Sequence, residues 1–526
     1  MTSGGNAFAF PSAIPVARGR GQATLHPPMR FVPFFPRLVR STLTAGLLCA
    51  GALATGCSDR SSGPVAVSVI GVRDDFAKPL ERLPDPGAKL ILEATAQGLV
   101  AFDAGGEILP ALAQRWIVQD DGRSYIFRLR RAFWPNGERV TAGDVARLLS
   151  ARIDSLRRLD PDGPLDAVDA VVPMTGEVVE IRLTAARPFV LQMLAQPQMA
   201  ILSSAGGTGP YRSEKRGKAL YLKPVDKTEE AEEAAGALPA WQNRIVRAER
   251  AALAIVRFRE GAADLVLGGR YADLPLLVPS GVDRDAVRVD PVQGLLGLAI
   301  TGKGALLDDG DIRRAINMSI DRSQLPAMFP LGGWATSEQL LPAQFELPAP
   351  APAPEWSALP IEERRARGRA AVGRWRAERK EPPPPLRIAL PDGPGSTMLF
   401  ALVAQGLHAI GLSAHRVAVK QDADLRLIDE VAAYDSALWY LGRVGCARGV
   451  HCSREAGDML QSASLAATAE ERAARIAQAV ALTQAHDGYI PLGTPVRWAL
   501  AARRLSGFMP SPRARHPLNH LFRATN

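Results

Sequence analysis

Apolar and polar residues alternate along several short segments of the chain, the pattern of half-buried β-strands. These segments are residues 65–69, 125–129, 179–183 and 386–390. Elsewhere apolar residues recur at the 3.6-residue spacing of a buried helix face. The helical segments are residues 90–100, 145–153, 312–320 and 402–410. Because strands and helices alternate throughout, the sequence predicts an α/β fold.

Polar residues at the ends of these segments predict where the helices begin and end. Thr141 can cap a helix, and Asp144 is an acidic variant of the partner that completes a capping box. Asp309 and Asp311 stand where the helix dipole favours negative charge, ahead of the 312–320 pattern. Gly411 is suited to end the helix that precedes it.

Two proline tracts, residues 347–354 and 382–385, predict extended connectors. Between them, residues 361–380 are rich in arginine and follow a helical pattern. Ala366, Ala370 or Ala371, and residues 372–375 are the expected buried stripe. Basic residues are spread thinly over the rest of the mature chain, and this segment is their one cluster. It is either a solvated helix face or a contact for lipid phosphates or nucleic acid.

The first 57 residues have the order of an export signal. Three arginines precede an apolar run that begins near Leu43, and the run ends at Leu53-Ala-Thr-Gly-Cys57. The run has about 14 residues, fewer than the ~20 that a membrane-spanning helix needs. The ending resembles a bacterial lipobox, with Ala54 in place of the usual leucine. We therefore expect residues 1–56 to be a signal peptide, with Met29 as its true start, and Cys57 to be lipidated. An ordinary secretory signal and a chance cysteine are the alternatives.

The composition of the mature chain limits its function and its number of domains only broadly. The sequence has 63 Lys+Arg and 54 Asp+Glu. Five of these arginines and none of the acids lie in residues 1–56, so the mature chain carries a formal charge of only +4. This balance argues against nucleic-acid binding, which needs clustered basic charge. The 470 residues that follow the signal are enough for two or three domains.

Cys446 and Cys452 are the cysteines that remain beyond the signal and the lipid site. An extracytoplasmic location favours a disulfide between them. Free thiols are one alternative. The other is a metal site with His451, for which two thiols and one imidazole are an incomplete set of zinc ligands.

Other candidate chemistry is weak. Residues 297–304 nearly match a phosphate-binding loop, but Gly304 stands where a Ser or Thr would hold magnesium. His516 and His520 form a pair without a third ligand, and we expect them to be solvated. Neither an HExxH motif nor a GxSxG motif is present in the sequence. We therefore expect no enzyme activity, no cofactor and no metal.

Several motifs, taken in order, resemble those of the bacterial extracytoplasmic solute-binding proteins of family 5, the peptide and oligopeptide receptors of ABC importers. The matching stretches are residues 93–113, 116–130, 133–145, 207–211 (Gly-Thr-Gly-Pro-Tyr), 258–264, 309–322 (DGDIRRAINMSIDR), 434–439 and 490–492. Each motif alone is weak, whereas their shared order spans nearly the whole mature chain.

The resemblance implies a two-lobed periplasmic binding protein fold of type II, with an extra subdomain on lobe one. Lobe one would comprise residues 57–95, 200–290 and 481–526, the extra subdomain residues 96–199, and lobe two residues 291–480. A small solute or peptide would bind between the lobes and be delivered to an inner-membrane ABC permease. The protein would be periplasmic and lipid-anchored, at the inner membrane rather than the outer.

The sequence departs from the family at one point that bears on specificity. Peptide receptors of this type often carry an acid shortly after the motif at 434–439, where it pairs with a ligand amino terminus. Residues 439–445 contain no acid, and Arg443 stands nearby. An anionic or uncharged ligand is therefore plausible. We expect Trp439, Tyr440 and Arg443 to contact the ligand, with Trp334 as a further aromatic candidate; packing in the core is the alternative for each aromatic.

Two functions follow. The first is a lipid-anchored receptor that captures a peptide-like or other small solute for an ABC importer. The second is a structural or regulatory lipoprotein that retains the fold without transport. The absent acid and the proline-rich insertion motivate the second.

Overall fold

The computed structural model describes residues 63–71, 86–159, 164–225 and 240–523, except for positions 333, 343, 344, 346, 348–350, 352, 465 and 467. These residues belong to one compact unit, Asp59–Asn526. The expected signal peptide 1–56, its start at Met29 and the expected lipid site Cys57 lie outside the described residues.

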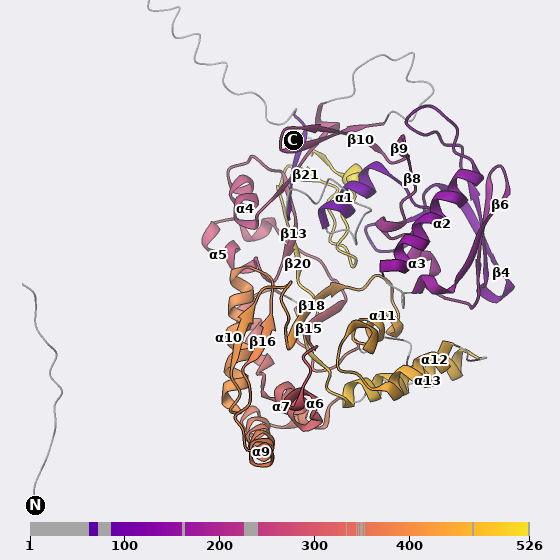
Figure 1. The fold of residues 1–526 in the computed structure, drawn as a ribbon. Helices are drawn as coiled ribbons and strands as arrows, with labels where there is room; N and C mark the ends of the chain where they lie inside the picture. The colour runs from indigo at the N-terminus through magenta and orange to yellow at the C-terminus, as the bar shows by residue number, and fades with distance from the viewer. Residues whose placement is uncertain are drawn as a thin grey trace, which may run out of the picture. The chain divides into compact units, whose positions relative to one another are not determined.

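Three sheets of four or more strands organise the described chain (Figure 1). The seven-stranded sheet has the order β10 (Tyr211–Arg216), β11 (Ala219–Pro224), β12 (Arg244–Glu249), β1 (Val65–Ile70), β13 (Leu265–Arg270), β20 (Arg497–Ala501) and β14 (Val287–Val289). The five-stranded sheet has the order β17 (Ala414–Val417), β16 (Leu386–Ala389), β18 (Leu425–Val431), β15 (Gly294–Ile300) and β19 (Tyr489–Gly493). The four-stranded sheet is antiparallel, with the order β4 (Ala113–Gln119), β5 (Ser124–Leu129), β7 (Val178–Leu183) and β6 (Val168–Thr175).

Short strand pairs and helices complete the fold. The pairs are β2 (Val100–Phe102) with β3 (Ile108–Pro110), β8 (Leu202–Ser203) with β9 (Gly206–Gly207), and β21 (Leu505–Ser506) with β22 (Phe522–Arg523). The helices are α1 (Pro86–Thr95), α2 (Ala142–Leu159), α3 (Val190–Leu194), α4 (Ala251–Arg259), α5 (Leu277–Ser280), α6 (Ala305–Asp308), α7 (Gly310–Ser319), α8 (Leu325–Met328), α9 (Ile361–Arg379), α10 (Pro394–Ala409), α11 (Ala437–Arg443), α12 (Arg454–Ser464) and α13 (Ala469–Ala485). The prediction of an α/β fold is confirmed.

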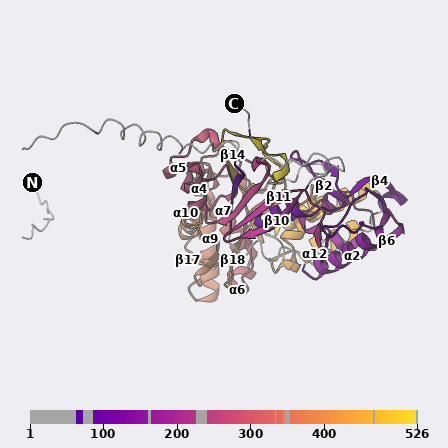
Figure 2. The same cartoon turned by 90° about the horizontal axis from the view of Figure 1, so that it is seen from above.

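The helices cover the sheets in separate groups. Helices α7, α9 and α10 pack beside the five-stranded sheet, and α2 lies beside the four-stranded sheet (Figures 1 and 2). Side chains from the seven- and five-stranded sheets join in one large core, which includes Trp498 of β20 and Ile388 of β16. No helix in the described part of the chain has both the length and the apolar character needed to cross a membrane.

The predicted capping residues form hydrogen bonds at the starts of α2 and α7. The amide of Asp144 donates to Thr141 Oγ1 over 3.1 Å, and the Thr141 hydroxyl donates to Asp144 Oδ2 over 2.7 Å. Asp309 Oδ1 accepts from the amide of Asp311 over 2.8 Å at the start of α7. These bonds satisfy amides that the first turn of a helix leaves without a partner.

Some local predictions need correction. Helix α1 begins at Pro86 and ends at Thr95, before the predicted residue 100. The turn that contains Gly209 packs against this end: a Cβ on Gly209 would lie 2.3 Å from the carbonyl carbon of Thr95. In α9 the buried stripe is Gly368, Ala371, Val372 and Trp375, whereas Ala366 is exposed. The near phosphate loop 297–304 starts inside β15, a fully buried strand.

The described chain passes from the seven-stranded to the five-stranded sheet through residues 290–293 and returns through residues 494–496. The amide of Asp290 donates to the carbonyl of Arg497 over 3.0 Å, which ties the two crossings together. The Arg497 guanidinium donates to Asp429 Oδ1 (2.7 Å) and to the Asp429 carbonyl (2.9 Å). The side chains of this pair are only 11% and 7% exposed.

His516 also lies at this crossing. Its side chain is 7% exposed, and its Nε2 lies 3.1 Å from Asp290 Oδ2. Its ring stacks on Phe508 with centroids 4.7 Å apart. The prediction that His516 is solvated is therefore wrong, because the C-terminal segment folds back over the first crossing.

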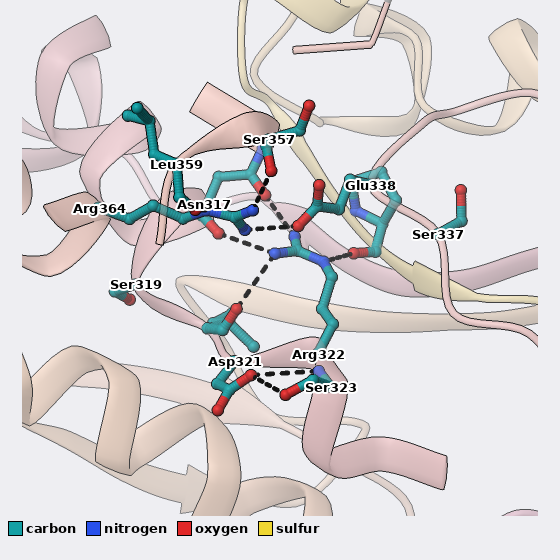
Figure 3. Close-up of polar contacts among 12 residues, drawn as sticks. Asn317, Ser319, Asp321, Arg322, Ser323, Ser337, Glu338, Ser357, Leu359 and Arg364 are labelled. Atoms are coloured by element: carbon teal, nitrogen blue, oxygen red, sulfur yellow. Dashed lines mark hydrogen bonds and ion pairs between the residues drawn. The ribbon is translucent and has the colours of Figure 1, made fainter. Parts of the chain in front are cut away.

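A second buried arginine joins the end of α7 to β19 (Figure 3). Arg322 donates to the carbonyls of Pro491 (2.6 Å) and Asn317 (3.1 Å). Burial lowers the pKa of Arg322 to about 10. Arg364 of α9 donates to Glu338 Oε1 over 2.5 Å. The guanidinium carbons of Arg322 and Arg364 lie 5.6 and 5.0 Å from the centroid of the Trp356 ring, so the tryptophan links both to the connector before α9.

Substitution of Arg497 tests how much the buried Arg497–Asp429 pair contributes to stability. We expect Arg497→Met to lower the free energy of unfolding by about 3 kcal/mol, because it leaves a buried carboxylate without its partner. The double variant R497M/D429L should recover part of this loss. Chemical denaturation measures both.

The exposed pair Arg503–Asp283 is the matched control, with side chains 78% and 55% exposed. Arg503→Met should cost about 0.5 kcal/mol or less. Equal losses for R497M and R503M would contradict a special role for the buried pair.

Candidate ligand-binding site

A cavity of about 710 Å³ lies between two parts of the chain that are distant in sequence. One wall comes from residues 156–199, with the end of α2, the turns η3 (Pro164–Ala167) and η4 (Pro197–Met199), and α3. The other wall comes from residues 433–483, with α11, the turn η11 (Cys446–Arg448), α12 and α13. This volume is typical of a site for a small organic molecule.

Direct contacts join the two walls. The Phe189 and Tyr434 rings stack with centroids 4.2 Å apart. The amide of Asp435 donates to Gln192 Oε1 over 2.9 Å, and Gln196 Nε2 donates to the Ala433 carbonyl over 2.5 Å. These bonds hold the loop before α11 against α3 and so fix the width of the cavity.

Two of the three predicted ligand contacts, Trp439 and Arg443, lie on the cavity wall. Both are on α11, where Ser436 caps the first turn by accepting from the amide of Leu438. Trp439 is 3% exposed, and its indole Nε1 has no hydrogen-bond partner among the described residues. Arg443 Nε lies 3.1 Å from Glu430 Oε2, so this guanidinium is already paired.

Tyr440 does not line the cavity, because successive helix positions point in different directions. It is fully buried behind Trp439, and the two ring centroids are 4.9 Å apart in an edge-to-face arrangement. Burial raises the pKa of its hydroxyl. Trp334 lies elsewhere, where its indole donates to the Thr494 carbonyl over 2.8 Å at the second crossing.

The cysteines lie at the edge of the cavity. The structure joins Cys446 and Cys452 in a disulfide, with Cα atoms 5.2 Å apart, and both line the cavity. The neighbouring His451 instead contacts the Gly302 carbonyl through Nε2. In the described ranges, no group of three or more His, Cys, Asp or Glu side chains is arranged to hold a metal ion.

Lys89 of α1 is close enough to several charged groups for its pKa to respond to them. Although its side chain is exposed, desolvation by the surrounding protein lowers its pKa to about 8. The positive charges of Arg515 and Arg270 lower this pKa further, while Glu430 and Glu93 raise it. The loss of hydration outweighs the two carboxylates, so the charged form of this amine is less favoured than in water.

Arg515 joins α1 to the cavity wall. Its guanidinium donates to Glu93 Oε1 (2.8 Å) and to Gln196 Oε1 (2.9 Å). The side chain is 9% exposed, and burial lowers its pKa. Arg515 therefore holds Glu93 of α1 beside Gln196, which lines the cavity.

Sequence reasoning missed Arg187, Arg472 and Lys89. Arg187 and Arg472 line the cavity from opposite walls, nearly 300 positions apart in the sequence. Neither stands in a motif that marks it, because arginines are frequent throughout this chain. Lys89 and Glu93 are the charged residues of α1, and their place among apolar residues was the available signal.

The pKa of Lys89 tests which charged groups surround it. Glu430→Gln should lower it below about 8, because the variant removes a charge that raises it. Arg270→Gln should raise it for the opposite reason. NMR titration of ¹³C-methylated lysines measures both shifts. Glu378→Gln on the exposed side of α9 is the control and should leave the value unchanged; shifts of the same sign in E430Q and R270Q would contradict the arrangement.

Solved structures with the same fold cover most of the chain. Haemophilus influenzae OppA, in complex with RPPGFSPFR, matches with a TM-score of 0.71 and 16% identity over 88% of this chain and 99% of that one. Burkholderia pseudomallei OppA matches with a TM-score of 0.73 and 15% identity over the same shares. AgaA of Agrobacterium tumefaciens, in complex with agropinic acid, matches with a TM-score of 0.67 and 16% identity over 88% and 99%. These likenesses show the two-lobed fold of periplasmic binding proteins.

Curated relatives match a short stretch only. The probable deoxycholate-binding periplasmic protein YgiS of Escherichia coli is 41% identical over 58 residues, 11% of each chain. A putative binding protein of Haemophilus influenzae is 42% identical over 55 residues, 10% of each chain. The match thus spans about a tenth of the length of these relatives.

The family model has the broadest sequence match. The model described as "Bacterial extracellular solute-binding proteins, family 5 Middle" matches residues 107–426, more than half of the chain. This range includes the four-stranded sheet, the first crossing and most of the five-stranded sheet. The chain belongs to the bacterial extracellular solute-binding proteins of family 5.

Proposed function

We propose that the protein is a lipid-anchored periplasmic receptor that captures a peptide-like or other small solute and delivers it to an inner-membrane ABC permease. The observation that carries the proposal is the cavity of about 710 Å³, whose two walls come from distant parts of a family 5 chain. A ligand that touches both walls would favour the closed arrangement by a shift of population. The receptor performs no covalent chemistry on its ligand.

The related proteins support a receptor but differ in their ligands. Printed descriptions name the peptide RPPGFSPFR for one OppA, agropinic acid for AgaA and probable deoxycholate binding for YgiS. Peptide specificity would need a partner for the ligand amino terminus. Glu430, the acid in contact with the predicted ligand residue Arg443, already pairs with it. The proposal therefore includes solutes other than peptides.

Native mass spectrometry of the mature chain, purified from a periplasm without its lipid, tests binding. We expect a bound mass of a few hundred daltons, and small-angle scattering should show a smaller radius of gyration when ligand is present. An empty protein that also keeps its radius across a library of peptides, sugar acids and metal chelates would support the alternative of a structural or regulatory lipoprotein.

The lipid anchor is tested separately at Cys57. Cys57→Ser should abolish incorporation of labelled fatty acid and move the protein from the membrane fraction to the soluble fraction, because the thiol that carries the lipid is gone. Cys49→Ser is the matched control, since Cys49 lies within the expected signal peptide. Equal labelling of wild type and C57S would overturn the anchor.

A further inference from the structure

The surface of the cavity is mainly apolar. Both walls contribute aliphatic, aromatic and thioether side chains, most of them at least half buried. They include Leu156, Leu165, Phe189 and Met193 on one wall and Leu438, Leu441, Val444, Leu460 and Ile476 on the other. A ligand gains free energy here in proportion to the apolar area that it removes from water.

Trp439 places a buried hydrogen-bond donor on this surface. The indole Nε1 of Trp439 makes no hydrogen bond to any described residue, although the side chain is 3% exposed. A buried donor that is left unpaired is costly, and native structures usually satisfy it. The position of Trp439 on the cavity wall makes an oxygen of a bound ligand a suitable acceptor.

The charges on the cavity wall are unbalanced. Arg187, Arg443, Arg448 and Arg472 line it, and Asp166 is the carboxylate that lines the same cavity. Glu430 pairs with Arg443, so the excess of positive charge comes from Arg187 and Arg472. Among the ion pairs of the described residues, none joins Arg187 or Arg472 to a carboxylate, and Arg187 donates to the Ala186 carbonyl over 3.4 Å instead. Both are partly buried, so the surrounding protein screens their charge less than bulk water would. The cavity therefore favours a negative group and disfavours a free ammonium.

We propose that this cavity selects solutes with a large apolar body and one anionic group, a carboxylate above all. Arg187 and Arg472 supply the positive potential, and the indole of Trp439 donates to a ligand oxygen. The inference rests on the proposed receptor function and narrows its substrate class. A peptide with a free amino terminus would bring an ammonium group into a cavity that already has an excess of positive charge.

Matched ten-carbon probes test the selection by charge. Decanoate, decanol and decylammonium share the apolar chain and differ in the head group. We expect isothermal titration calorimetry to give decanoate at least a tenfold lower Kd than either of the others. The Kd of decanoate should rise with ionic strength, as expected for attraction to guanidinium groups.

Variants assign the effect to the two arginines. Arg187→Gln and Arg472→Gln should each raise the Kd of decanoate roughly tenfold, the size expected for a charge-assisted contact, and leave that of decanol unchanged. Trp439→Phe should weaken decanoate binding and keep an aromatic wall. Arg376→Gln is the matched control, because Arg376 is exposed on α9 and does not line the cavity. Circular dichroism confirms that each variant is folded.

The outcomes separate the inference from the proposed function. Equal Kd values for decanoate and decylammonium, or an unchanged Kd in R187Q/R472Q, would overturn the inference. Binding of the tripeptide Ala-Ala-Ala without binding of decanoate would also overturn it, while the receptor function would stand. Failure of every probe and of the solute library, with no change in radius of gyration, would count against the receptor function itself.

Discussion

The buried ion pair between Arg497 and Asp429 joins the two main sheets, and much of the structure depends on it. Arg497 begins β20 in the seven-stranded sheet, while Asp429 lies on β18 in the five-stranded sheet. Both side chains are nearly inaccessible to water, so each charge requires the other. The pair sets how the chain returns from one sheet to the other, and Glu430, next to Asp429, takes its position from the same strand.

The second buried cation, Arg322, acts within the five-stranded part. It holds the end of α7 against the carbonyl of Pro491 in β19, and Trp356 connects it to Arg364 of α9. The described residues of the connector are therefore held both by these polar contacts and by apolar packing, since Phe345, Leu347 and Ala351 lie against the cluster that contains Tyr440. This polar cluster lines a recess of its own, but its charged groups already have partners within the protein. Arg364 pairs with Glu338, and Arg322 donates to the Pro491 and Asn317 carbonyls (Figure 3). It is better explained as structural than as a ligand site.

The cavity shows how a site can arise between surfaces that have separate structural roles. Residues 186–199 complete the core of the four-stranded part, and α11 to α13 form a separate apolar cluster with Phe189 and Met193. Hydrogen bonds from Gln192 and Gln196 bring the two surfaces together at one edge. Farther from that edge, the apolar surfaces separate, and arginines from both sides face the space between them.

Local patterns and the order of the motifs were enough to predict many of the elements and the family. Alternation predicted β1, β5, β7 and β16, capping residues predicted the starts of α2 and α7, and ordered motifs predicted the solute-binding fold. These signals are local or follow the order of the chain, so they need no knowledge of distant contacts. The end of α1 was predicted too far along the chain. Tight packing against Gly209 occurs at this end, and the local pattern does not show it.

Which residues share the cavity depends on contacts between segments that are far apart in the chain. Trp439 and Arg443 reach the wall while Tyr440 turns into the core, because neighbouring positions on a helix face different directions. Arg187 and Arg472 line the same cavity although they are nearly 300 positions apart, and no motif around either residue indicates this. The charge of a site is a sum over groups that folding brings together, and for that reason the sequence could indicate an anion only through Arg443.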